Sequence, residues 1–442
     1  MKSLIILVGI IPLAIIPVLI ILRTKSSLRN HYLLVLVFVG PLFLVFTNPD
    51  GPRGVYDGGS IFINLSILYV SAVPLIALLI SRPQKDIYIT RPKNLASGEV
   101  LRFCWVIIFI LGLYSAYKSE TKLMPFTLTI MFGITLFLIF AGDFNFDMLL
   151  VAVYRIFAII ASVTLISFIL KFNWENYTDV QLQDLDYDSS VYFSPLSKIF
   201  GLPARAGGPF GAPTVASMFY IFGLTCFFAS RFKEKNYLTP VLFLICGSLT
   251  GTRTFYVAVL TLFSYLLIKR FLPKNFVVFW AALISFMAIN IFLLVKLVLP
   301  VLVSDTATLS NLTGRTKLWQ FILERWNSDG VFGHGPGTLS SLTYDYLGFP
   351  FSHAHNSILQ YLWDFGLLGL AVVILFFIVQ LIAISYERKH DVIGIALCLL
   401  TIQTEPTLVP SVSLVEWFWL IPLCAVFSRD LADKSRSEIA FN

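Results

Sequence analysis

Two histidines and an asparagine stand directly before a long apolar run, in the stretch SHAHNSILQYLWDFGLLGL (352–370). His353 and His355 are two of the five histidines in the chain, and His334 precedes them in GHGPG. One interpretation is general-base catalysis, because a neutral imidazole can take a proton from a hydroxyl near pH 7. A second is a metal site made by these three histidines with Asp345, although the spacing of two residues suits chelation from a helix poorly. A third is structural, because asparagine is a good N-cap for the helix that follows.

Two arginines stand where helices are expected to begin, in surroundings that favour an anionic ligand. Arg253 lies in the short turn of LTGTRTFYVAVL (249–260), where small residues admit a ligand to outward-pointing helix amides. Its planar guanidinium suits a diphosphate. The alternative interpretation is that the side chain only extends toward the polar membrane interface. Arg315 and Lys317 open the amphipathic stretch NLTGRTKLWQFILERW (311–326). Cations in a first turn oppose the helix dipole, which indicates either an anionic partner or a solvated helix start.

Two further arginines are weaker candidates. Arg205 lies in the glycine-rich GLPARAGGPFGAPTVA (201–216), where the backbone can approach a ligand closely. Arg155 lies in the middle of the apolar run VAVYRIFAII (151–160). A charge inside a membrane span costs a few kcal/mol, so Arg155 needs an acidic partner on another helix, a water-filled cavity or an anionic ligand.

The composition indicates what must position these residues. The chain is 57% hydrophobic and only 13% charged, whereas a soluble domain carries about 25% charged residues. Its apolar runs are long enough to span a membrane, and they are continuous, which excludes a β-barrel. We therefore expect an all-α polytopic transmembrane helical bundle. The net charge of +7 is better explained by cytoplasmic loops than by nucleic-acid binding.

The length of the apolar runs predicts about 12–13 spans. Most of the 32 Lys and Arg residues lie in one set of loops, which is therefore cytoplasmic, so the amino terminus faces outward. We expect a single integral membrane domain over 1–442 with two outer-facing loops, 171–209 and 304–355, the second carrying part of the active site. The acidic loop 171–209 either contacts the substrate or is a solvated cap. The expected spans are 3–22, 32–47, 61–80, 100–116, 123–141, 148–170, 210–230, 237–250, 255–269, 275–303, 356–385, 392–409 and 413–427.

Four segments together resemble one family. HNSILQYLWDFGLLG places His355, Asn356, Gly366 and Gly369 at a spacing similar to the signature of the O-antigen ligase and polymerase superfamily of bacterial membrane glycosyltransferases. LTGTRTF resembles the outer-facing arginine turn of that family, and TGRTKLW followed by FGHGPGT resembles the first part of its large periplasmic loop. GGPFGAPTVASM resembles its glycine-rich entry to a preceding span. The resemblance covers about residues 200–385.

This resemblance implies a GT-C-like, metal-independent, inverting glycosyltransferase without a cofactor. Its donor would be a glycan on undecaprenyl diphosphate, at the outer face of the bacterial inner membrane among the membrane lipids. By motif, His355 would be the base that deprotonates the acceptor hydroxyl, and Arg253 and Arg315 would bind the diphosphate. Further substrate contacts are expected from Arg205, His353 and Asn356.

The shared motifs do not distinguish between the possible acceptors. A polymerase joins one lipid-linked repeat to another, whereas a ligase transfers the glycan to lipid A-core. We favour the polymerase, for which a chain-length regulator would be the partner protein, and keep the ligase as the alternative. The absence of an appended acceptor domain weakens a protein-glycosylating function. A lipid-linked sugar transporter or flippase is the second alternative, although it would be expected to show internal repeats or broken charged helices, and only Arg155 fits that description.

Overall fold

The structure is a computed structural model, and every regular element that it describes is a helix. The chain is thus all-α where it is described, as the apolar runs predict. The described residues are 15–23, 28–39, 72–80, 95–118, 123–140, 145–169, 213–230, 236–271, 315–326, 332–335, 338–339, 342–343, 354 and 356–388.

The helices follow the predicted spans closely. Residues 15–23 and 72–80 are also helical, whereas the predicted spans 275–303, 392–409 and 413–427 lie outside the described residues. The labelled helices are α2 (Arg29–Val39), α5 (Leu95–Lys118), α6 (Leu123–Phe140), α7 (Phe146–Ile169), α10 (Pro213–Ala229), α11 (Leu238–Leu249), α12 (Arg253–Phe271), α16 (Arg315–Arg325) and α18 (Ser357–Arg388).

Length and surface chemistry together identify a polytopic helical membrane protein. Two segments, Phe146–Ile166 in α7 and Ile358–Phe376 in α18, are long and apolar enough to cross a bilayer. Large apolar side chains such as Phe103 and Ile159 are more than half exposed, which suits a lipid-facing surface. Shorter apolar helices cover Thr129–Ile139, Ala216–Ala229, Leu238–Leu249 and Ala258–Leu267.

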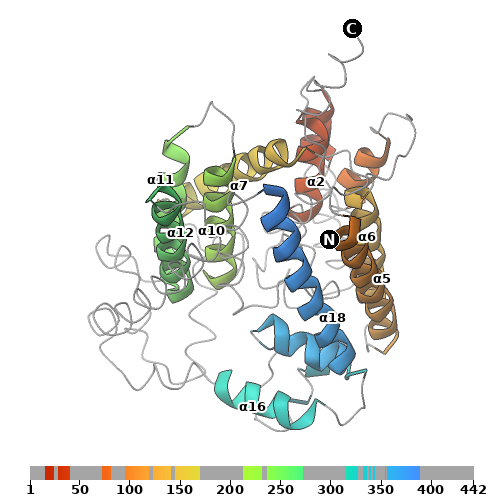
Figure 1. Ribbon diagram of the computed structural model, residues 1–442. Helices are drawn as coiled ribbons and strands as arrows, with labels where there is room; N and C mark the ends of the chain where they lie inside the picture. The colour runs from red at the N-terminus through yellow and green to blue at the C-terminus, as the bar shows by residue number, and fades with distance from the viewer. Residues whose placement is uncertain are drawn as a thin grey trace, which may run out of the picture.

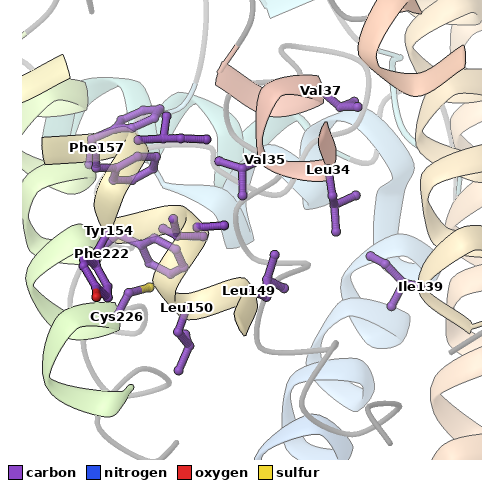
Figure 2. Close-up of a cluster of buried hydrophobic side chains, with 14 of the residues drawn as sticks. Leu34, Val35, Val37, Ile139, Leu149, Leu150, Tyr154, Phe157, Phe222 and Cys226 are labelled. Atoms are coloured by element: carbon purple, nitrogen blue, oxygen red, sulfur yellow. The ribbon is translucent and has the colours of Figure 1, made fainter. Parts of the chain in front are cut away.

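Most of the described helices, whose arrangement Figure 1 shows, share one cluster of buried hydrophobic side chains. Helix α7 packs against α2, α10 and α11, and α12 packs against α10 and α11, whereas α5 packs against α6 and α18. Figure 2 shows Tyr154 and Phe157 of α7 beside Phe222 and Cys226 of α10. Because lipid tails are as apolar as these side chains, close packing rather than the hydrophobic effect stabilises such contacts.

Small residues bring neighbouring helices together. A Cβ atom added to Gly133 of α6 would lie 2.5 Å from the ring of Phe109 in α5, and one added to Gly223 of α10 would lie 2.7 Å from the ring of Phe243 in α11. Each aromatic ring thus occupies the space that the glycine leaves, as is typical of interfaces between membrane helices.

Two polar contacts join α2 to α7. The Arg155 guanidinium donates a hydrogen bond to the Tyr32 hydroxyl (3.3 Å), a neutral partner that none of the three expectations for this arginine named. At the start of α7, the Asn145 N–H donates to His31 Nε2 (2.9 Å), and Asn145 Oδ1 caps the helix by accepting from the Met148 N–H (3.1 Å). Arg155 is therefore tied to a neighbouring helix in the structure.

Candidate functional site

Helix α16 lies crosswise at the end of the bundle where α18 begins (Figure 1). Its apolar residues Leu318, Phe321 and Ile322 are buried against Trp363 of α18. The amphipathic face predicted for 311–326 is thus confirmed. This packing anchors α16 beside the start of α18.

Helix α18 is broken near its beginning. Gly366 has φ 67° and ψ −161°, a conformation that side-chain-bearing residues rarely adopt, so the helix divides here into two parts. The break frees two backbone oxygens, which accept hydrogen bonds from a loop: Trp363 O from the His334 N–H (2.8 Å) and Asp364 O from the Gly335 N–H (3.1 Å). Gly366, a glycine of the family signature, therefore creates a helix end, and the loop at Gly333–Gly335 donates hydrogen bonds to it.

The loop can approach this closely only because it carries a glycine. Gly333 has φ 72°, and a Cβ atom there would lie 2.5 Å from both Gly366 N and Trp363 O. A Cβ atom on Gly369 would overlap the side chain of Phe365 one turn earlier. These glycines are thus explained by backbone conformation and packing.

His334 connects the loop to both helices. Its ring is only 6% exposed and stacks on Trp363, with ring centroids 4.0 Å apart and planes at 22°. Its Nε2 lies 3.0 Å from the backbone oxygen of Arg325 at the end of α16. Because a carbonyl oxygen only accepts hydrogen bonds, Nε2 carries the proton in this contact. Where the structure describes it, His334 acts as a structural bridge.

The metal interpretation gains no support from the described part of the chain. No group of three His, Cys, Asp or Glu side chains there is placed to hold a metal ion. The other proposed ligands, His353, His355 and Asp345, lie outside the described residues.

Ala354, which separates the two histidines, is held at both of its backbone polar atoms. Its N–H donates to Gln360 Oε1 (2.7 Å), and its oxygen accepts from Trp319 Nε1 of α16 (2.8 Å). Ala354 is completely buried. The residue before His355 is therefore held from α18 at its N–H and from α16 at its oxygen.

Asn356, on the other side of His355, is the N-cap of α18. Its Oδ1 accepts from the N–H groups of Ile358 (2.9 Å) and Leu359 (3.1 Å). The capping interpretation is thus confirmed, while its expected contact with substrate stays a prediction. Both neighbours of His355 are consequently anchored by hydrogen bonds.

The two arginines of the family motifs each occupy the first residue of a helix, as expected. Arg253 begins α12 and Arg315 begins α16. The turn before Arg253 has Gly251 at φ 60°, between Thr250 and Thr252, whose buried hydroxyl oxygens lie 3.1 Å apart. A helix N-terminus, a favourable place for an anion, thus lies at each arginine.

The remaining expected contacts cannot be placed from the structure. The side chains of Arg253 and Arg315 lie outside what is described, as do the residues Arg205, His353 and His355. Their roles in binding and catalysis stay predictions.

Sequence reasoning missed Gln360 and Asp364. Both are buried, and the Gln360 amide Nε2 donates to Asp364 Oδ2 (3.0 Å). A signal was present, because two polar residues four positions apart on an apolar helix face the same side and need partners there.

These features define a polytopic helical membrane protein in which the loop at Gly333–Gly335 meets α18 at its glycine break. Residues 238–374, from the start of α11 into α18, match the family model described as O-Antigen ligase. The match supports the resemblance of this segment to the O-antigen ligase/polymerase superfamily, and with it a ligase- or polymerase-type activity in general. No curated protein matches the chain.

Proposed function

We propose that the protein is a polymerase-type glycosyltransferase. It moves a glycan from undecaprenyl diphosphate to a sugar hydroxyl of a second lipid-linked glycan, at the outer face of the bacterial inner membrane. The observation that best supports this proposal is the anchoring of both neighbours of His355, Ala354 and Asn356, inside the segment that matches the family. A catalytic base needs such a fixed backbone, because misplacement by about 1 Å can cost 10²-fold in rate.

The proposed reaction is a single displacement. The His355 imidazole takes the proton of the acceptor hydroxyl, whose oxygen attacks the anomeric carbon of the donor. The bond from that carbon to the diphosphate oxygen breaks, undecaprenyl diphosphate leaves, and the configuration inverts. Arg253 and Arg315 offset the charge that develops on the diphosphate, which a permanently charged guanidinium can do without a metal ion.

The alternative acceptor is lipid A-core, which would make the protein an O-antigen ligase. The name of the matching family, O-Antigen ligase, favours this alternative. Both reactions use the same donor and the same leaving group, so they differ only in the molecule that supplies the hydroxyl.

The test is an assay of the purified full chain in liposomes with undecaprenyl-diphosphate-linked glycan. We expect released undecaprenyl diphosphate and lengthened glycan with the lipid-linked repeat alone, and no loss of either with a chelator. Release that requires lipid A-core would instead identify a ligase. A transporter would release no undecaprenyl diphosphate under any condition, and that result would overturn the proposal.

Replacing Arg253 by lysine should separate charge from geometry. Lysine keeps the positive charge but loses the planar fork that binds a phosphate through two hydrogen bonds, and a hydrogen bond to a charged group contributes about 1.5–3 kcal/mol. We expect the kcat/KM for the donor to fall about 10- to 100-fold. The matched control is Arg270→Lys near the other end of α12, in the predicted cytoplasmic set, which should leave kcat/KM unchanged. Equal effects of the two substitutions would remove Arg253 from the donor site.

A further inference from the structure

A buried polar pair on α18 is hydrogen-bonded to the backbone of Ala354. Gln360 and Asp364 are each only 1% exposed. Gln360 Nε2 donates to Asp364 Oδ2 (3.0 Å), and Gln360 Oε1 accepts from the N–H of Ala354 (2.7 Å). A continuous chain of hydrogen bonds thus runs from a carboxylate to the peptide that separates His353 from His355.

The direction of these hydrogen bonds follows from atoms that can only donate or only accept. A backbone N–H only donates, so the oxygen of the Gln360 amide must face Ala354. The amide nitrogen then faces Asp364, whose carboxylate accepts. On the other side, Trp319 Nε1 only donates, and it does so to the oxygen of Ala354. The backbone of Ala354 is therefore held at both its N–H and its oxygen.

The acidic side chain contributes more than packing. Asp364 Oδ1 is buried and has no hydrogen-bond partner in the described part of the chain, which is costly for a polar atom. The other oxygen, Oδ2, accepts a hydrogen bond from the Gln360 amide nitrogen (3.0 Å).

We infer that Asp364 is a positioning residue for the transfer reaction: through Gln360 it fixes the peptide at Ala354, and thereby the place of the two flanking histidines. The inference rests on the proposed function, in which His355 is the base. Asp364 itself needs no contact with substrate in this arrangement.

Reversing the polarity of the pair tests the inference. In Gln360→Glu, the new carboxylate still accepts from the Ala354 N–H, but it cannot donate to Asp364, and the two carboxylates repel each other. We expect kcat to fall about 10- to 100-fold, with the KM for the donor unchanged. In the double variant Gln360→Glu/Asp364→Asn, the amide at 364 donates to the carboxylate at 360, so the network is restored with its direction reversed.

The double variant distinguishes positioning from direct chemistry. If positioning is the role, its kcat returns to within about 3-fold of the wild type, and Asp364→Asn alone loses less than about 10-fold, because the new amide oxygen can still accept from Gln360. If the unpartnered Oδ1 instead handles a proton, both variants that lack the carboxylate stay inactive. That result would overturn the inference.

A second readout does not depend on the reaction. Diethyl pyrocarbonate modifies neutral imidazoles, and mass spectrometry of the full-length protein reports the rate at each histidine, with His390 as the internal reference. We expect the rates at His353 and His355 to change relative to His390 in Gln360→Glu and to return in the double variant. If the wild type transfers no glycan, the proposed function fails while these rates still test the inference. If the wild type transfers glycan, but neither kcat nor the modification rates change in Gln360→Glu and return in the double variant, the inference alone fails.

Discussion

His355→Ala is expected to lower the release of undecaprenyl diphosphate about 10²- to 10⁴-fold, the contribution typical of general-base catalysis. The reason is that the acceptor hydroxyl would attack without losing its proton to a positioned imidazole. Donor binding should be retained, because the proposed diphosphate contacts belong to Arg253 and Arg315. The measurement compares kcat with the equilibrium affinity for the donor in the same purified preparation.

The control for this prediction is another histidine. His390 lies in a predicted cytoplasmic loop, so His390→Ala should keep the wild-type rate. Equal activity of His355→Ala and the wild type would remove His355 from the mechanism. Activity of the wild type that vanishes with a chelator would instead revive the metal interpretation.

Gly333→Ala should have the largest structural effect, because two costs coincide at this position. The residue has φ 72°, which costs a side-chain-bearing residue about 1–2 kcal/mol. Its Cβ would also lie 2.5 Å from Gly366 N and Trp363 O, backbone atoms that cannot turn aside. Overpacking of this kind costs about 1–3 kcal/mol more, so the total is about 2–5 kcal/mol. We expect a lower thermal unfolding midpoint and a loss of transfer activity.

Gly335→Ala is the matched control for Gly333→Ala. Gly335 also has positive φ (90°), so its substitution carries the conformational cost, whereas among the described contacts the close approach to Gly366 N and Trp363 O belongs to Gly333. The thermal midpoint should therefore fall less than in Gly333→Ala. If the two variants melt at the same temperature, the close approach of the loop to α18 is not what stabilises this junction.

Structural features that depend on residues close together in the sequence were predictable from the sequence. The apolar runs at 123–141 and 148–170 correspond to α6 and α7 within one or two residues, because the length of an apolar run is set by the bilayer. The helix start at Arg253 follows from a local turn of small residues. The buried face of α16 follows from the helical spacing of its apolar residues.

Contacts between distant segments were not predictable in this way. The hydrogen bond from Asn145 to His31 joins residues 114 positions apart, and the bond from Trp319 to Ala354 joins residues 35 positions apart. Such pairs depend on which helix faces are brought together, and side-chain spacing along one helix does not specify its neighbour. His334 illustrates the consequence, because the same residue type that suggested chemistry is a buried bridge between α16 and α18.

The sequence by itself determined a membrane-embedded helical chain and the motif residues that resemble those of the O-antigen ligases and polymerases, since both depend on residue type and local order. Only the tertiary structure decided what holds those motif residues. The break at Gly366 leaves two backbone oxygens without helical partners, and the peptide at Ala354 lies outside the helix, so each needs hydrogen bonds from elsewhere. Those partners come from a loop, from α16 and from Gln360, and folding alone brings them together.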